Sequence, residues 1–351
     1  MLLNSLRVPS FEILINQKPL KDSITWQISR ITVDDQIDLP SMFTLELEAS
    51  EATLSQTEWV NDKKLFAIGD DIDIKLGYDK KLKKVISSEV TFVELEYRAD
   101  SLPRMTVRGY DRRHRLQRGH KIRNFLKKKD SDIAKQIAGE AGISITATDS
   151  EVIHDYIIQA NQTDFAFLQE RARRINYELI MRDKSLLFRP VNFDADPILP
   201  LSMDNQLTRF SAQFSATGQI TQATVKGWDI SNKKVISAPC DKLLSKNKGA
   251  LIGPKLVAKE FGQAARLFSD EPVATIQEAK KRAEGEFAAS SLSFIRGEGE
   301  CPGENKLKAG VVVEIKGVDS RASGLYYVTA VTHSFSLDGF TTHFTAWRNA
   351  I

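Results

Sequence analysis

The sequence predicts a mainly β protein that carries an α/β insertion. Apolar and polar residues alternate with a period of two through most of residues 24–108, and this period returns in the last third of the chain. Between these regions, apolar residues recur at helical spacing. We therefore predict three domains: a β-barrel domain at residues 1–112, an inserted α/β domain at 113–203, and a second β-barrel domain at 204–351.

The first third is predicted to form short strands. Alternation is strictest where Phe43, Leu45 and Leu47 are separated by polar residues. A turn is predicted at Asp100–Pro103. The other strands are expected at residues 24–33, starting from Ile24 and Trp26, and at 69–75, 90–97 and 105–108.

Two helices and a hairpin are predicted in the middle third. The first helix spans residues 131–141, with Asp130 or Ser131 as its N-cap and Gly142 just after its end. The second helix runs from about Thr163 to Ile175. Strands at 177–180 and 186–188 then form a hairpin across residues 183–185.

The last third returns to strands. A strand is predicted at residues 224–228, continuing through Val235 and Ile236, and further strands at 294–295 and 310–316. Residues 241–270, rich in Lys, Gly and Ser, are expected to form a long surface loop. A helix at 275–289 should bury one face, and a final hairpin should turn at Asp338-Gly339. The expected buried face of that helix consists of Ile276, Ala279, Ala283 and Phe287.

Composition excludes several classes of protein. The 351 residues include 49 Lys and Arg against 46 Asp and Glu, so the net charge is only +3, too small for a whole-chain polyanion binder. No apolar run is long enough for a membrane helix, and no secretory signal is visible. Two cysteines, Cys240 and Cys301, cannot form a disulfide framework, and we expect both to be unbridged in a reducing compartment.

The two strand-rich ends of the chain resemble each other. Gly69-x-x-Ile-x-Ile-Lys75 matches Gly310-x-x-Val-x-Ile-Lys316, and Val90–Val93 matches Val328–Val331 at a similar distance. Hairpin partners follow, ending at Arg108 and Arg348. Chance similarity among valine-rich strands is the alternative; a true repeat would make the two β-domains related.

No residue pattern predicts catalysis, a metal or a cofactor. With a turn at Asp338-Gly339, His333 faces Phe344 and His343 faces Ser334, so the two histidines lie on opposite faces of the hairpin. The cysteines lack metal-ligand spacing. Glycines at 297, 299 and 303 have the wrong spacing for a dinucleotide motif and lead toward a strand. The predicted catalytic, cofactor-binding and metal-binding residues are therefore none.

One segment is strongly basic. Residues 104–129 hold 11 Lys and Arg and a single acid, Asp111. A nucleic-acid site is one interpretation. Because only Tyr110 and Phe125 are available for base stacking, a solvated or protein-contacting face is favoured.

Several segments resemble phage late control D proteins and VgrG-type spike proteins. Residues 161–170 are similar to the N-x-T-D-F-x-F-L segment of that family, 224–229 to its V-x-G-W-D strand, and 109–111 to its G-Y-D. The ending is also similar, at Gly299–Gly303, Ala309-Gly310, Gly324–Thr329 and Thr332-His333. These motifs occur in the family's order from about residue 105 to 348.

The resemblance implies a baseplate hub of a contractile phage tail or contractile injection system. Its two barrels would be tail-tube-like, and a homotrimer would adapt a sixfold tail tube to a threefold spike. Partners would be a separate spike protein, the tube protein and baseplate wedge proteins, in a particle assembled in the cytoplasm. Only three residues follow Arg348, so the resemblance lacks the spike part.

Two other functions compete with this hypothesis. A cell-wall-binding or wall-degrading tail component is suggested by residues 130–138, which faintly resemble a LysM helix, although no complete LysM module can be placed. A nucleic-acid-binding protein would use the basic segment, and its binding would weaken steeply with salt.

Overall fold

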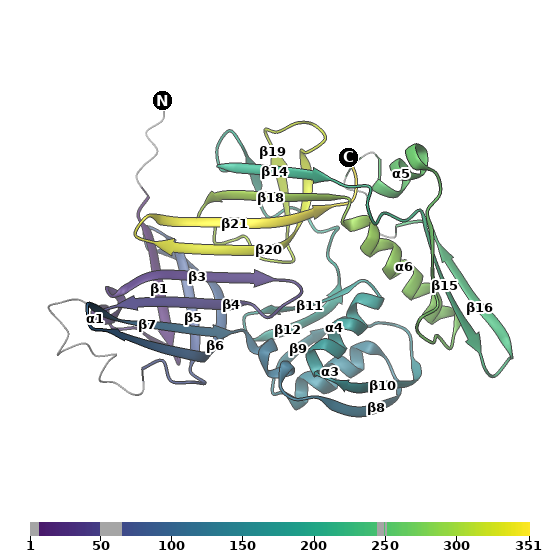
Figure 1. Cartoon of the computed structure of the whole chain (residues 1–351), viewed down its shortest axis with the longest axis horizontal. Helices are drawn as coiled ribbons and strands as arrows, with labels where there is room; N and C mark the ends of the chain where they lie inside the picture. The colour runs from purple at the N-terminus through teal and green to yellow at the C-terminus, as the bar shows by residue number, and fades with distance from the viewer. Residues whose placement is uncertain (1–6, 50–64, 244–248, 250) are drawn as a thin grey trace. The chain divides into compact units, whose positions relative to one another are not determined.

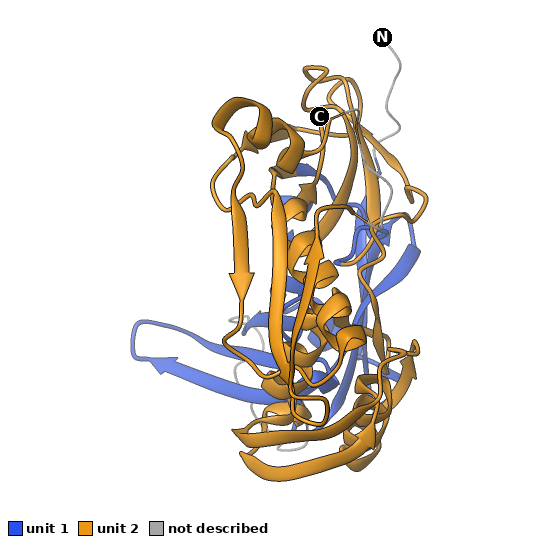
Figure 2. Ribbon diagram, turned by 90° about the vertical axis from the view of Figure 1, so that its right-hand side faces the viewer, with its two compact units in different colours: residues 1–114, 300–309, 330–344 blue, residues 115–299, 310–329, 345–351 orange. Residues whose placement is uncertain are grey.

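A computed structural model describes residues 7–49, 65–243, 249 and 251–351 (Figure 1). The fold is mainly β, as the sequence predicts, but the described residues form a large, mostly antiparallel sheet and no closed barrel. Compactness divides the chain into two units (Figure 2). Unit 1 comprises residues 1–114, 300–309 and 330–344, and unit 2 comprises 115–299, 310–329 and 345–351.

Unit 1 is an antiparallel sheet with one buried face. Its strands are hydrogen-bonded in the order β20-β3-β4-β7-β6-β5-β1-β2, and within the described residues this path closes no barrel. The strands are β1 (Pro9–Ile15), β2 (Lys18–Pro19), β3 (Ile28–Gln36), β4 (Met42–Glu48), β5 (Asp71–Tyr78), β6 (Lys81–Arg98), β7 (Ser101–Tyr110) and residues 330–336 of β20 (Gly324–Ser336).

Alternation explains the core of unit 1. Phe43, Leu45 and Leu47 of β4 are fully buried, because every second side chain of a strand points to the same face. The strand predicted from Ile24 is wrong at its start, since Asp22–Thr25 forms the short helix α1 and β3 begins at Ile28. Ile24 is the buried residue of α1, whereas Trp26, just after this helix, is 88% exposed.

The middle of the chain forms a compact α/β part of unit 2. Strand β8 pairs with β10, and β11 and β12 form a hairpin whose second strand pairs in parallel with β9. The 3-10 helix η2 (Arg112–Gln117) leads into these elements. They are β8 (Lys121–Lys128), α3 (Asp130–Glu140), β9 (Ser144–Ala147), β10 (His154–Gln162), α4 (Asp164–Arg174), β11 (Tyr177–Arg182) and β12 (Ser185–Pro190).

The helix ends of this part were largely predictable. Thr163 caps α4, and its hydroxyl accepts a hydrogen bond from the Ala166 N–H at 3.1 Å. Gly142 follows α3 with a left-handed φ of +66°. The predicted cap of α3 is wrong, because the N-cap position is Lys129 and the Asp130 side chain turns inward to an ion pair.

The remainder of unit 2 departs from the sequence prediction at two places. The predicted loop at 241–270 contains α5 (Gly253–Phe261) and β17 (Ala265–Phe268), although residues 244–248 and 250 lie outside the described residues. Helix α6 (Ile276–Leu292) buries Ala279, Ala283 and Phe287 but leaves Ile276 39% exposed. The remaining strands are β13 (Pro200–Ser202), β14 (Arg209–Phe214), β15 (Gln222–Asp229), β16 (Lys234–Cys240), β18 (Ile295–Pro302), β19 (Val312–Lys316) and β21 (Gly339–Arg348). Residues 300–302 of β18 and 339–344 of β21 belong to unit 1.

The final hairpin turns one residue earlier than predicted. Its turn is Leu337-Asp338, since Gly339 already belongs to β21. Each residue of β20 therefore faces a residue two positions earlier in β21 than predicted, and His333 Nδ1 lies 2.9 Å from Thr342 Oγ1 instead of facing Phe344.

The sequence repeat has a structural counterpart. Gly69 and Gly310 both adopt left-handed φ, +95° and +81°, two residues before β5 and β19 begin. The Gly69 N–H donates to the Val90 carbonyl at 2.9 Å, and the Gly310 N–H donates to the Val328 carbonyl at 2.8 Å. Hydrogen-bonded strand order also matches, β4-β7-β6-β5 against β18-β21-β20-β19.

Candidate functional site

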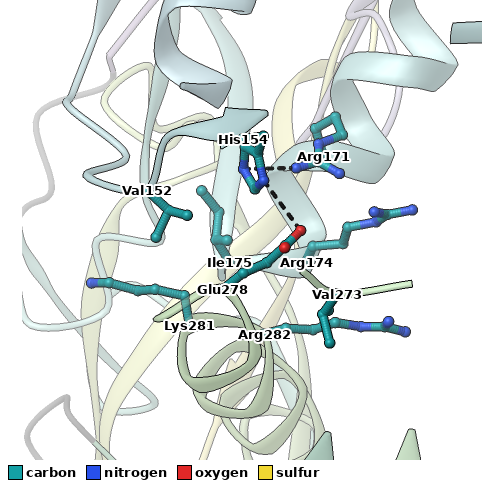
Figure 3. A pocket seen from close by; sticks show the side chains of 9 residues that line it. All are labelled: Val152, His154, Arg171, Arg174, Ile175, Val273, Glu278, Lys281 and Arg282. Carbon is teal, nitrogen blue, oxygen red and sulfur yellow. Dashed lines mark hydrogen bonds and ion pairs between the residues drawn. The ribbon is translucent and has the colours of Figure 1, made fainter. Parts of the chain in front are cut away.

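A cluster of buried charges is the most distinctive side-chain site of unit 2. His154, at the start of β10, points toward Arg171 of α4 and Glu278 of α6 (Figure 3). Its Nδ1 lies 3.1 Å from Glu278 Oε1, and its Nε2 lies 3.0 Å from Arg171 Nη2 and 3.3 Å from Asp130 Oδ2. Arg171 Nε donates to Asp130 Oδ1 at 2.6 Å.

The electrostatics of this cluster favour charged forms. Burial opposes protonation of His154, but hydrogen bonds to Asp130 and Glu278 outweigh it and raise the pKa of the imidazole. Burial also opposes ionisation of Asp130, yet the hydrogen bond from His154 and the Arg171 charge lower the pKa of that carboxyl. The pKa of Glu278 is lowered by the same histidine and by the Ala274 N–H, against burial.

The arrangement of these side chains fits a structural role, in which ion pairs hold neighbouring elements together. Its cavity is only about 20 Å³, room for about one water. No hydroxyl or thiol lines it; the lining residues are Val152, His154, Arg171, Arg174, Ile175, Val273, Glu278, Lys281 and Arg282. Because the four ion-pairing groups come from α3, β10, α4 and α6, their main effect is to hold these elements together.

Sequence reasoning did not identify this cluster. Its four members are separated by as many as 148 residues, from position 130 to position 278, and none belongs to a spaced motif. The same holds for the buried pair of Glu178 and Tyr327, whose side chains are hydrogen-bonded. Burial raises the pKa of Glu178 despite the nearby Arg189.

The G-Y-D segment builds a buried network in unit 1. Asp111 and Arg113 are fully buried and paired, with 2.7 Å between Asp111 Oδ2 and Arg113 Nη2. Arg113 also donates to the Ser41 hydroxyl and the Gln36 carbonyl. Gly109 is required by close packing, since a Cβ there would lie 2.1 Å from the Glu89 carbonyl oxygen.

Folding neutralises much of the basic segment. Lys121 and Arg123 both pair with Asp164, at 2.7 and 2.6 Å, and Asp164 belongs to the N-x-T-D-F segment. At least six of the 11 cations form ion pairs with acids; these are Arg104, Arg112, Arg113, Lys121, Arg123 and Lys129. This pairing supports the protein-face interpretation over a nucleic-acid site.

The V-x-G-W-D segment combines core and surface residues. Val225 is buried, and a Cβ at Gly227 would lie 2.3 Å from a Val273 methyl group. Trp228, in contrast, is 52% exposed.

The remaining candidates occupy structural positions. His333 is buried, its Nε2 lies 3.1 Å from the Leu307 carbonyl, and burial lowers its pKa to about 4, whereas His343 is exposed. Cys240 is half-buried and Cys301 buried, and both are free thiols. Gly297 lies within β18 against Phe210.

The described residues contain no group of three or more His, Cys, Asp or Glu side chains placed to hold a metal ion. None of their helices is long and apolar enough to cross a membrane. The helix that resembles LysM, α3, is followed by β9 and β10 before α4, so a second helix does not follow at short spacing.

The fold is similar to that of phage tail proteins and of a type VI secretion system component. The structure is similar to the 43 kDa tail protein of prophage MuSo2 from Shewanella oneidensis, with 15% identity and a TM-score of 0.72 over 97% of this chain and 98% of that chain. This similarity confirms the predicted resemblance to tail proteins at the level of the fold.

Two further solved structures are also similar. The E. coli c3393 protein, a type VI secretion component with structural similarity to bacteriophage T4 gp27 and gp5, shows 10% identity and a TM-score of 0.61 over 96% of this chain and 77% of that one. A chain of the Francisella PdpA-VgrG complex shows 9% identity and a TM-score of 0.55 over 98% of this chain and 53% of that one.

A family model also matches the chain. The model of the Alg8 N-terminal domain matches residues 5–336, and the chain belongs to this family. A search of curated proteins finds no match.

Proposed function

We propose that this protein is a structural baseplate hub of a contractile phage tail or contractile injection system. Three copies form a ring that adapts a sixfold tail tube to a threefold spike. The separate spike lies on one side of the ring, the tube on the other, and wedge proteins surround it. The particle is assembled in the cytoplasm.

The internal repeat is the observation that carries this proposal. Gly69 and Gly310 have the same backbone conformation, the same hydrogen bond to an aligned valine, and the same succession of strands after them. Two related tube-like strand sets in each of three chains would present six similar units to a sixfold tube. In this proposal the two tube-like domains are residues 1–112 and 204–351, and the α/β insertion 113–203 lies between them in the sequence.

The proposed role is structural, not enzymatic. Motif residues such as Asp111, Thr163 and Asp164 act in buried pairs and helix caps. The similar solved structures from Shewanella and E. coli are tail and secretion-system components.

Electron microscopy of the assembled particle tests the proposal. We expect threefold density at the layer of this chain, with two similar strand sets per copy. Six identical copies per layer would make the chain a tube or wedge subunit and overturn the hub assignment. Turnover of peptidoglycan, abolished by a point substitution in this chain, would overturn the non-enzymatic role.

A further inference from the structure

Trp228 belongs to an exposed apolar group next to the turn of the β15–β16 hairpin. Figure 1 shows where this hairpin lies in the fold. Trp228 pairs directly with Val235, so the two side chains share a face of the hairpin. Val235 is 62% exposed, and Ile230, just beyond the strand, is 82% exposed. Large apolar side chains gathered in this way are typical of contact surfaces.

Exposed lysines lie on the same hairpin. Lys226 shares the face of Trp228, Lys233 belongs to the turn, and Lys234 pairs with Asp229 on the opposite face. The only acid among residues 226–235 is Asp229, and its carboxylate accepts two hydrogen bonds from Asn232, at 2.9 and 2.7 Å. The hairpin patch is therefore basic with an apolar centre; it consists of Lys226, Trp228, Ile230, Lys233, Lys234 and Val235.

A segment of unit 2 has the opposite charge. Residues 191–208 contain three aspartates and no lysine or arginine. All three aspartates are exposed, and so are two large apolar residues of the same segment. This acidic patch consists of Asp194, Asp196, Ile198, Met203 and Asp204.

We propose that the hairpin patch of one copy docks on the acidic patch of the next copy. The two patches complement each other in charge, and each offers apolar side chains to exclude water. A ring of three requires such a contact between unlike surfaces, because a patch that binds its own twin closes a twofold dimer. The inference rests on the proposed ring and names the surfaces that close it.

Sedimentation velocity of the full chain, over a range of concentrations and at low and high salt, tests this contact. We expect self-association that weakens with salt. Trp228→Ala should weaken it roughly thirtyfold, the size of an interface hot spot. Lys233→Glu/Lys234→Glu and Asp194→Lys/Asp196→Lys should each weaken it, and combining the two reversals in one chain should restore it.

Matched controls separate this contact from general effects. Trp26→Ala removes a more exposed tryptophan of unit 1, and Lys81→Glu/Lys83→Glu makes the same charge change on β6. Both should associate as the wild type does. A monomeric wild type at every concentration, or reversals that do not rescue each other, would overturn the inference.

The particle distinguishes failure of this inference from failure of the hub proposal. A threefold layer formed equally well by Trp228→Ala would exclude the hairpin contact and leave the hub intact. Six identical copies per layer would overturn both the hub proposal and the hairpin contact.

Discussion

Replacing Arg113 by methionine should destabilise unit 1 far more than removal of a surface cation. Arg113 Nε and Nη2 lie 2.9 and 2.7 Å from Asp111 Oδ2, and both side chains are buried. Arg113→Met leaves the Asp111 carboxylate in the core with only backbone N–H donors, from Ser41 and residue 113. An uncompensated buried charge of this kind costs about 3–5 kcal/mol.

The matched control is Arg104→Met. Arg104 pairs with Glu48 at 3.2 Å, but the side chains are 56% and 49% exposed. Such a pair contributes about 0–1 kcal/mol, because water and salt screen it. Chemical denaturation followed by circular dichroism measures both losses, and hydrogen exchange of the β4 and β7 amides locates them.

A double variant tests the physical reason. Asp111→Leu/Arg113→Met removes both charges, so it should recover much of the stability lost by Arg113→Met. Equal losses for Arg113→Met and Arg104→Met would refute the reasoning. A double variant less stable than Arg113→Met would show that packing, not charge burial, dominates.

Three further outcomes are expected. Stabilisation from protonated His154 is complete below about pH 6.5 and is lost as pH rises through the raised pKa of the folded protein. The melting temperature of the wild type should therefore exceed that of His154→Asn by less at alkaline pH than at acidic pH. A difference in melting temperature that stays constant with pH would exclude this linkage. Gly139→Ala in α3 meets open space and should stabilise by about 0.5–1 kcal/mol in denaturation; a loss would contradict this. Native alkylation followed by mass spectrometry should label half-buried Cys240 well before Cys301, whose burial raises its pKa to about 12; equal rates would show that β18 opens readily.

Local patterns predicted the elements whose signals are contained in a few residues. The alternation of Phe43, Leu45 and Leu47 identified β4, and the helical spacing of apolar residues located α4, because burial of one face is visible within a few residues. Helix α5 was missed within a Lys- and Gly-rich segment, although Pro254 at its first turn is a helix-start signal.

Features that depend on distant residues could not be predicted. The partners of His154 come from three other elements, and nothing in their spacing shows that they meet. The prediction of the final turn was wrong for a local reason. Gly339 adopts a φ of +125° inside the strand, so the turn moved to Leu337-Asp338 and every pair shifted.

The path of the chain through unit 1 limits how the protein can be dissected. Strand β3 pairs along Arg30–Gln36 with residues 330–336, which the ribosome makes almost 300 residues later. A fragment ending at residue 114 would leave that side of β3 with unpaired backbone groups and expose Phe43 and Leu45 near an open edge. Such fragments should aggregate. Useful truncations therefore keep both ends of the chain and shorten the segment between them.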